Sequence, residues 1–186
     1  MTLRIHGRRT LKSPVGSRTR PTSSRLRQAL FDVLGDAVEG CRWLDLCSGA
    51  GTMGAEALSR GAAFVVGVEI SRRACEIVRH NWSAVAAPDQ RFRVVAADVV
   101  QALRRMPPGE VYDVVYFDPP YDSDLYRTVL PLLANVVAPG GVAIVEAPKG
   151  AVLERCIGSL ALTSVRRSGR AELWFYAHAV DAGASQ

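Results

Sequence analysis

The sequence predicts an α/β protein built on a doubly wound, mostly parallel sheet, with a C-terminal antiparallel hairpin and a small basic N-terminal extension. Two observations support this fold class. Between residues 42 and 146, short apolar runs alternate with stretches whose apolar residues recur at helical spacing. The first apolar run also ends in a glycine-rich turn ahead of a helical pattern, which is typical of the first strand-to-helix unit of such sheets.

The predicted elements follow one another with short connections. Strands are predicted at Arg42–Leu46, Phe64–Val68, Phe92–Ala96, Val111–Phe117 and Val142–Glu146. Helices are predicted between them, at Met53–Ser59, Arg72–Ser83, Val99–Arg105 and Leu125–Asn135. Near the C-terminus, two more strands, Leu162–Arg166 and Glu172–Tyr176, flank Ser168-Gly169 and predict a hairpin that closes one edge of the sheet.

An additional helix is predicted ahead of the first strand. Four apolar residues lie at helical spacing, and Ser or Thr at positions 22–24 can cap the N-terminus: Leu26, Leu30, Val33 and Leu34 form this face. With 186 residues and 48% hydrophobic content, the chain can bury one sizeable core. We therefore expect a basic arm at residues 1–22, one main domain at 23–180 and a frayed tail at 181–186.

The cysteines and histidines do not form a metal-binding pattern. Cys41, Cys47, Cys75 and Cys156 are scattered without a C-x-x-C pair, and no histidine lies near them in sequence. We therefore expect no metal and no disulfide framework, but small buried hydrophobic residues in a reducing compartment. No apolar run has the length of a membrane span, and the basic N-terminus lacks an apolar signal core. These features predict a cytoplasmic protein without a membrane partner.

Charge is concentrated at the N-terminus. The net charge is +5, yet eight basic residues and no acidic residue precede Asp32. A segment of one sign favours a polyanionic partner and is typical of nucleic-acid binding. The alternative is a solvated tail without a partner, because charge runs are common.

Acidic residues follow four successive predicted strands. They are Asp45, Glu69, Asp98 and Asp118. Ligands of open α/β sheets bind at the carboxyl ends of the strands, so these four side chains are expected at one edge. A single carboxylate at a strand end is ordinary, but four in succession indicate a binding site.

The glycine-rich turn supports two interpretations. Gly49, Gly51 and Gly54 match the G-x-G-x-x-G dinucleotide pattern, and Glu69 lies about twenty residues on, where a ribose ligand is expected. Asp45 favours a different nucleoside, because a carboxylate beside the helix N-terminus opposes a pyrophosphate. S-adenosylmethionine carries a sulfonium and an amino group instead, for which an acidic rim is favourable. The sequence therefore favours S-adenosylmethionine over NAD.

The fourth strand ends in the motif VVYFDPPY, which suits chemistry on a planar amine. An exocyclic amine shares its lone pair with the ring and attacks a methyl group poorly unless acceptors hold it. The Asp118 carboxylate and the Pro119 carbonyl are two such acceptors, and consecutive prolines fix the direction of that carbonyl. Tyr121 offers a flat face on which an extruded base can stack.

At this point the chain resembles a known family. D-x-x-x-G-x-G followed by D-P-P-Y resembles the signature pair of Rossmann-like methyltransferases that act on planar exocyclic nitrogens. The segment Ala55–Ala62, AEALSRGA, and Arg20-Pro21-Thr22 ahead of the helical pattern are similar to the RsmD family, bacterial guanine-N(2) methyltransferases of 16S ribosomal RNA. The resemblance covers most of the chain. The chain departs from the family pattern in a compressed segment at residues 4–9 and in Ser168, where an aromatic residue is usual.

The resemblance implies a role for each candidate residue. It implies S-adenosylmethionine as cofactor and small-subunit ribosomal RNA as partner, either as naked RNA or within a partly assembled subunit. Glu69 and Asp98 are expected to hold ribose and adenine; Asp45, Gly49 and Gly51 the methionine side; and Asp118, Pro119 and Tyr121 the target base. RNA phosphates are expected at the arm residues Arg4, Arg8, Arg9 and Arg20.

Other functions remain open at this stage. D-P-P-Y-like turns serve all planar nitrogens, so an adenine amine or a protein glutamine amide is an alternative acceptor. From other classes come an NAD(P)-dependent oxidoreductase and a nucleic-acid-binding module without catalysis. A measurement of cofactor binding distinguishes the oxidoreductase from a methyltransferase. A measurement of turnover distinguishes the binding module from an enzyme.

Overall fold

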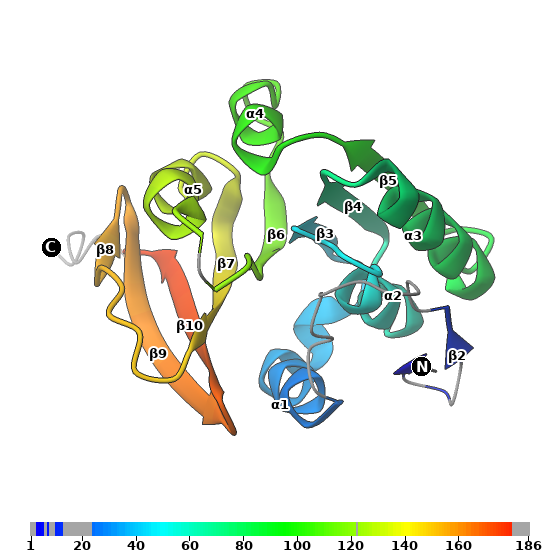
Figure 1. Cartoon of the computed structure of the whole chain (residues 1–186), viewed down its shortest axis with the longest axis horizontal. Coiled ribbons are helices and arrows are strands. Elements are labelled where there is room, and N and C mark those ends of the chain that lie inside the picture. Colours follow the sequence, from blue (N-terminus) through cyan, green and yellow to red (C-terminus); the bar gives the residue numbers. More distant parts are fainter. Residues whose placement is uncertain (1–2, 6, 8–9, 13–23, 122, 180–186) are drawn as a thin grey trace, which may run out of the picture.

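The computed structural model describes residues 3–5, 7, 10–12, 24–121 and 123–179. An eight-stranded sheet with the order β5-β4-β3-β6-β7-β10-β9-β8 runs through the molecule (Figure 1). The five strands from β5 to β7 are parallel, and β10, β9 and β8 continue the sheet as antiparallel strands. The predicted fold class is confirmed. The strands of this sheet are β3 Arg42–Leu46, β4 Phe64–Glu69, β5 Arg91–Ala96, β6 Tyr112–Phe117, β7 Val137–Pro148, β8 Cys156–Ile157, β9 Leu160–Ser168 and β10 Ala171–His178.

Helices cover both faces of the sheet. The α-helices are α1 Ser24–Leu34, α2 Thr52–Ser59, α3 Arg72–Val85, α4 Val99–Arg104 and α5 Leu125–Leu133, and a short 3₁₀ helix, η2 Gly35–Val38, follows α1. Apolar residues of α1, α2 and α3 pack on one face, and those of α4 and α5 pack on the other (Figure 1). Strands β3 and β6 lie between the two layers, which explains why their apolar runs are almost continuous.

The C-terminal hairpin is inserted in an order that its sequence does not reveal. Strand β10 pairs with β7, and β9 lies outside it, so the last strand of the chain sits inside the sheet. The short strand β8 then covers the outer side of β9. The hairpin was predicted correctly, but it is this small additional strand that forms the edge.

Strand β7 is longer than predicted because it includes a bulge. Tyr112 of β6 pairs with Val137, and Val114 pairs with Val142, so β7 accommodates extra residues between the two pairs. The sequence Pro139-Gly140-Gly141 lies in this bulge and predicts a turn when taken alone. A Cβ at Gly141 would lie 2.9 Å from two backbone carbonyl oxygens, so only glycine fits this close approach.

The described part of the basic arm packs against the main domain. Residues Leu3–Arg4 (β1) and Thr10–Leu11 (β2) form a short antiparallel pair, and Ile5 and Leu11 are buried in the core beside α1 and α3. Asn81 of α3 accepts the backbone N–H of Lys12 at 2.8 Å and donates to its carbonyl at 2.9 Å. The domain boundary expected at residue 22 stays a prediction, but residues on both sides of it share one core. The tail at 181–186 lies outside the described residues.

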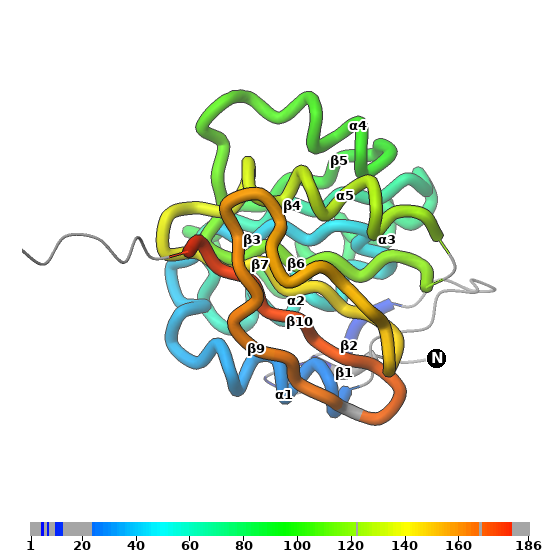
Figure 2. The backbone as a smooth tube through the Cα atoms, turned by 90° about the vertical axis from the view of Figure 1, so that its left-hand side faces the viewer, coloured from blue at the N-terminus to red at the C-terminus, as the bar shows by residue number. Residues whose placement is uncertain are grey.

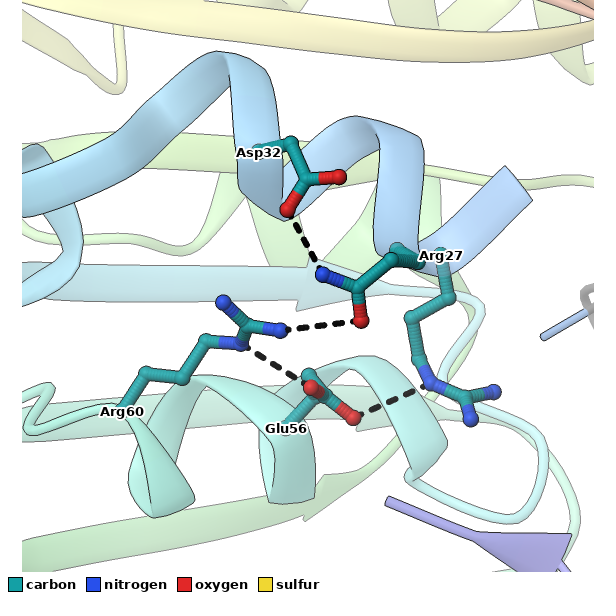
Figure 3. Close-up of polar contacts among 5 residues, drawn as sticks. Arg27, Asp32, Glu56 and Arg60 are labelled. Atoms are coloured by element: carbon teal, nitrogen blue, oxygen red, sulfur yellow. Dashed lines mark hydrogen bonds and ion pairs between the residues drawn. The ribbon is translucent and has the colours of Figure 1, made fainter. Parts of the chain in front are cut away.

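Helix α1 buries a different face from the one predicted. Leu26 and Leu30 are buried as expected, whereas Val33 is 48% exposed and Arg27 and Phe31 are buried instead. The Arg27 guanidinium donates to Glu56 of α2 at 3.0 Å, and Arg60 donates to the other Glu56 oxygen at 2.9 Å (Figure 3). Because the Glu56 side chain is only 3% exposed, this ion pair holds α1 on α2.

Candidate active site

The four predicted carboxylates follow neighbouring strands at one edge of the sheet. Asp45 of β3 pairs in register with Gly67 and Tyr116, just before the ends of β4 and β6. Glu69 ends β4 opposite Ala96 of β5. The strand order therefore brings together side chains that are separated by as many as 73 positions in the sequence.

The pKa of the Cys47 thiol is affected by all four carboxylates. Burial raises its pKa to about 12, and the negative charges of Glu69, Asp118, Asp45 and Asp98 add to the shift. All four carboxylates therefore act on one point, directly after β3. Cys47 is also the one non-glycine residue with a positive φ, 63°, in the described part of the chain. Such a conformation is uncommon for a residue with a side chain and is typical of functional turns.

Glu69 organises the glycine-rich turn. Its two carboxylate oxygens accept the backbone N–H groups of Gly49 at 2.9 Å and of Ser71 at 2.8 Å. Each carboxylate oxygen has a second lone pair, so the side chain can still accept bonds from ligand hydroxyls. A Cβ at Gly49 would meet no atom within 4 Å, so the turn is open on that side. An open turn beside a fixed carboxylate fits a nucleoside.

Asp45 lies beneath the turn rather than at its rim. The residue is 1% exposed, and its carboxylate accepts the Gly54 N–H in the first turn of α2 at 3.1 Å. Burial raises the pKa of this carboxyl to about 7; the bond from Gly54 opposes the shift, and the charge of Glu69 adds to it. The Asp45 carboxyl therefore lies close to the helix N-terminus, in surroundings that disfavour its negative charge.

Two of the three fingerprint glycines are required by an indole ring. A Cβ at Gly54 would lie 2.2 Å from the Trp82 ring, and one at Gly51 would lie 2.7 Å from Trp82 Nε1. The Trp82 N–H donates to the Gly51 carbonyl at 2.7 Å. Packing of α3 against α2 therefore explains Gly51 and Gly54 without a phosphate ligand, which removes much of the argument for a dinucleotide.

Asp98 and Ile70 follow β5 and β4, at the same end of the parallel strands as the turn. Asp98 is half-buried and caps α4, because its carboxylate accepts the Gln101 N–H at 3.0 Å. Ile70 follows Glu69 directly and is 71% exposed. Ile70 was not predicted from the sequence, because a single isoleucine at a strand end does not form a recognisable motif.

The DPPY segment leaves the sheet directly beside the turn. The N–H of Asp118 donates to the Leu46 carbonyl at 3.4 Å, which ties the start of the segment to the end of β3. Asp118 is half-buried, Pro119 is buried and Pro120 is exposed. Burial raises the pKa of the nearby Tyr126 hydroxyl, and the charge of Asp118 adds to this shift. The segment that carries Asp118 and Pro119 therefore lies next to the glycine-rich turn.

Glu146 is a residue of this site that the sequence did not reveal. It lies on β7, is 4% exposed, and accepts a hydrogen bond from the Tyr121 hydroxyl at 3.2 Å. The Tyr116 hydroxyl bonds its second carboxylate oxygen, and the Tyr126 hydroxyl donates to its backbone carbonyl at 2.9 Å. A buried carboxylate in an apolar strand thus holds the aromatic ring of the DPPY motif. The signal was present, because a charged residue interrupts the run Ala143-Ile144-Val145, but its partners could not be read from sequence.

Most residues of the expected RNA-binding arm lie outside the part of the chain that the structure describes. Arg8, Arg9 and Arg20 lie outside the described residues, and for Arg4 only the backbone, in β1, is described. In the described part of the chain, no group of three or more His, Cys, Asp or Glu residues has a geometry that could hold a metal ion. The described helices also include none that is both long and apolar enough to cross a membrane.

Comparisons with known proteins agree with this geometry. The model of the family described as conserved hypothetical protein 95 matches residues 3–177. The chain belongs to this family. The match covers nearly the whole chain, so the resemblance to the RsmD family that the motifs predicted is confirmed.

Relatives of this family member are methyltransferases by name. The ribosomal RNA small subunit methyltransferase D of Escherichia coli is 31% identical over 127 residues, which cover 68% of this chain and 62% of the relative. YlbH of Bacillus subtilis, an inferred rRNA methyltransferase, is 28% identical over 158 residues, 83% of this chain and 85% of the relative. The solved structure of yhhF from Escherichia coli, an inferred methyltransferase, has a TM-score of 0.82 at 28% identity and covers 96% of this chain and 98% of that chain.

Proposed function

We propose that this chain transfers a methyl group from S-adenosylmethionine to the exocyclic N(2) amine of a guanine in small-subunit ribosomal RNA. The observation that carries the proposal is the position of the DPPY segment beside the glycine-rich turn, at the strand ends that also carry Asp45 and Glu69. Membership in a family whose relatives are named rRNA methyltransferases supports the reaction and the substrate class. A ribosomal RNA substrate implies that the protein acts in the cytoplasm.

The cofactor side of the site fits S-adenosylmethionine. When bound, this cofactor supplies a methyl group already activated by a positive sulfonium. Glu69 is positioned to accept hydrogen bonds from the ribose hydroxyls, and Asp98 from the adenine amine. Ile70 would cover one face of the adenine ring. The buried charge of Asp45 favours the cationic methionine end, because a positive neighbour relieves its desolvation.

The acceptor side fits a flat amine. The Asp118 carboxylate and the Pro119 carbonyl accept the two amine N–H bonds and so direct the nitrogen lone pair away from the ring. Tyr121 stacks on the base, and Glu146 holds the Tyr121 hydroxyl so that the ring keeps its orientation. With the methyl group already activated, positioning supplies much of the acceleration.

Replacing Asp118 tests this assignment. Asp118→Ala should slow turnover by raising the activation free energy by about 2 to 4 kcal/mol, a loss similar to that of an oxyanion-hole donor. Binding of adenosylhomocysteine should be retained. The assay is labelled methyl transfer to partly assembled small subunits, followed by nucleoside mass spectrometry. Asp124→Ala is the matched control, because Asp124 is exposed and its side chain makes no capping bond on α5.

The products separate the proposal from its alternatives. N(2)-methylguanosine that disappears in Asp118→Ala supports the mechanism. Methyladenosine or methylated protein would overturn the substrate and leave the reaction class standing. Thermal stabilisation by NAD(P) and none by adenosylhomocysteine would overturn the methyltransferase itself.

A further inference from the structure

The turn of the β9–β10 hairpin carries a group of exposed basic side chains. Arg166 of β9, Arg170 of the turn and Lys149, just after β7, are all exposed. The Lys149 N–H donates to the Arg170 carbonyl at 2.9 Å, which joins the end of β7 to the hairpin turn. We refer to Lys149, Arg166 and Arg170 as the hairpin cluster.

The strand register places this cluster beside the acceptor side of the site. Glu146 of β7 pairs with Leu173 of β10, and Leu173 pairs with Arg166 of β9. Directly paired residues point to the same face of a sheet, so Glu146 and Arg166 share a face and lie two strands, or about 10 Å, apart. Since Glu146 bonds the Tyr121 hydroxyl, the register places Arg166 two strands away from the residue that holds Tyr121.

The charges of the cluster are available to a ligand. Among the described residues, no carboxylate lies within 4.0 Å of the Lys149 ammonium or of the Arg166 and Arg170 guanidinium groups. Arg27 and Arg167 differ, because each donates to a buried glutamate. The charge of a paired arginine is largely neutralised by its glutamate, whereas exposed unpaired cations are free to bind phosphate.

A groove runs from this cluster along helix α1. Its lining is shared by two elements: Ala29, Asp32 and Val33 come from α1, and Val165, Arg166 and Arg167 from β9. Figure 2 shows α1 and the hairpin turn at the same end of the molecule, and Figure 1 agrees from the perpendicular direction. Asp32 is the acidic side chain of the lining and bonds Gln28 at 2.6 Å. Arg167 is paired with Glu172, so Arg166 supplies the positive charge of this lining that is open to a ligand.

We propose that the hairpin cluster and this groove bind the phosphates of the RNA strand that flanks the methylated base. The inference rests on the proposed function, because it assumes that a nucleotide occupies the Asp118 and Tyr121 site. Phosphate contacts fix register and orientation without reading sequence. The cluster therefore positions the strand while the DPPY segment selects and holds the base. It adds a second, C-terminal phosphate-binding surface to the N-terminal arm expected from the sequence.

Charge reversal tests this surface in the full-length chain. Arg166→Glu/Arg170→Glu should weaken binding of a mixed-sequence single-stranded RNA at least tenfold near physiological salt. The slope of log affinity against log salt should flatten by about 1.4, or about 0.7 for each lost phosphate contact. Adenosylhomocysteine affinity should stay unchanged, because the glycine-rich turn follows β3, and β6 and β7 separate that strand from the hairpin.

A second double variant controls for net charge. Arg104→Glu/Arg105→Glu makes the same change in charge at exposed arginines at the end of α4, on the other face of the sheet. Its RNA affinity should fall less, and its salt slope should stay close to that of the unmodified chain. Thermal melting and adenosylhomocysteine binding of both variants establish that they are folded.

Two distinct outcomes contradict the two proposals. The hairpin surface is overturned if both double variants lose RNA affinity and salt slope equally, or if the hairpin variant loses neither. In either case the proposed function stands as long as the unmodified chain transfers methyl groups to RNA. If the unmodified chain binds adenosylhomocysteine but methylates no RNA, the proposed function fails and the hairpin surface fails with it.

Discussion

The cofactor side and the acceptor side of the site are held in place by different kinds of contact. On the cofactor side, carboxylates accept main-chain N–H groups: Glu69 bonds Gly49 and Ser71, and Asp45 bonds Gly54. On the acceptor side, side chains hold side chains, as Glu146 of β7 accepts the Tyr121 hydroxyl. The first arrangement follows from the path of the backbone, and the second depends on which side chains meet across strands.

This difference predicts two kinds of sensitivity. Backbone donors remain when a side chain is replaced, so changes on the cofactor side should act through charge and ligand contact. A tyrosine held by one glutamate loses its orientation when that glutamate changes, so substitutions on the acceptor side should act on the rate. The predictions that follow test this contrast.

The largest effect is expected at Asp45. Its pKa of about 7 in the fold lies above the usual value of 3.8, so the fold favours the neutral carboxyl. The stability gained from this preference is fully present below pH about 4 and is lost as the pH rises towards 7, a few kcal/mol in all. Asp45→Asn keeps an acceptor for Gly54 and should remove this pH dependence. Urea unfolding between pH 5 and 8 measures it.

The pH dependence is the informative quantity here, because a buried asparagine amide has a desolvation cost of its own. Asp36→Asn serves as a control at an exposed carboxylate and should leave the profile unchanged. If the charge of Asp45 attracts the cationic methionine end, as proposed, adenosylhomocysteine should bind Asp45→Asn more weakly. An unaltered slope in Asp45→Asn would show that Asp45 does not titrate in this range.

An intermediate effect is expected at Glu146. Glu146→Gln leaves one acceptor oxygen for two tyrosine hydroxyls, so Tyr121 should lose its fixed orientation. Loss of a hydrogen bond to a charged group corresponds to about 1.5 kcal/mol, or about tenfold in turnover. Adenosylhomocysteine affinity should not change. Steady-state methyl transfer and calorimetric binding of adenosylhomocysteine measure the two quantities.

A double-mutant cycle separates positioning from general damage. Tyr121→Phe removes the hydroxyl that Glu146 holds and keeps the stacking ring. If Glu146 acts through Tyr121, Glu146→Gln should cost much less in the Tyr121→Phe background than in the unmodified chain. Fully additive losses would show that Glu146 supports the fold through its other contacts instead.

The smallest effect is expected at Ile70. If adenine covers this exposed side chain, Ile70→Ala should weaken adenosylhomocysteine binding by about 1 kcal/mol through the lost apolar contact. Stability should change little, because the side chain is 71% exposed in the free protein. Val33→Ala, at an exposed valine of α1, is the control and should bind the cofactor product normally. Equal affinities in both variants would remove Ile70 from the site.

Much of the fold and of the cofactor side could be predicted from the sequence. The strand from Arg42 to Leu46 was predicted with its observed bounds, and the alternation of strands and helices reproduced the parallel half of the sheet. The four carboxylates were expected at one edge, because parallel strands in such a sheet all end there. Local periodicity and strand direction are sufficient for these statements, and both are encoded in short segments.

The acceptor side and the roles of individual arginines were decided by tertiary structure. The sequence groups Arg27 with the basic residues that precede Asp32, yet Glu56 of α2 pairs with it. Arg166 is in register with Glu146 only because β10 lies between β7 and β9. Glu146 acquires its role from tyrosines 25 and 30 positions away in the chain. A sequence specifies which side chains follow each strand, but the charge that pairs with each one depends on strand order and register. Those are set by long-range packing that no local pattern contains.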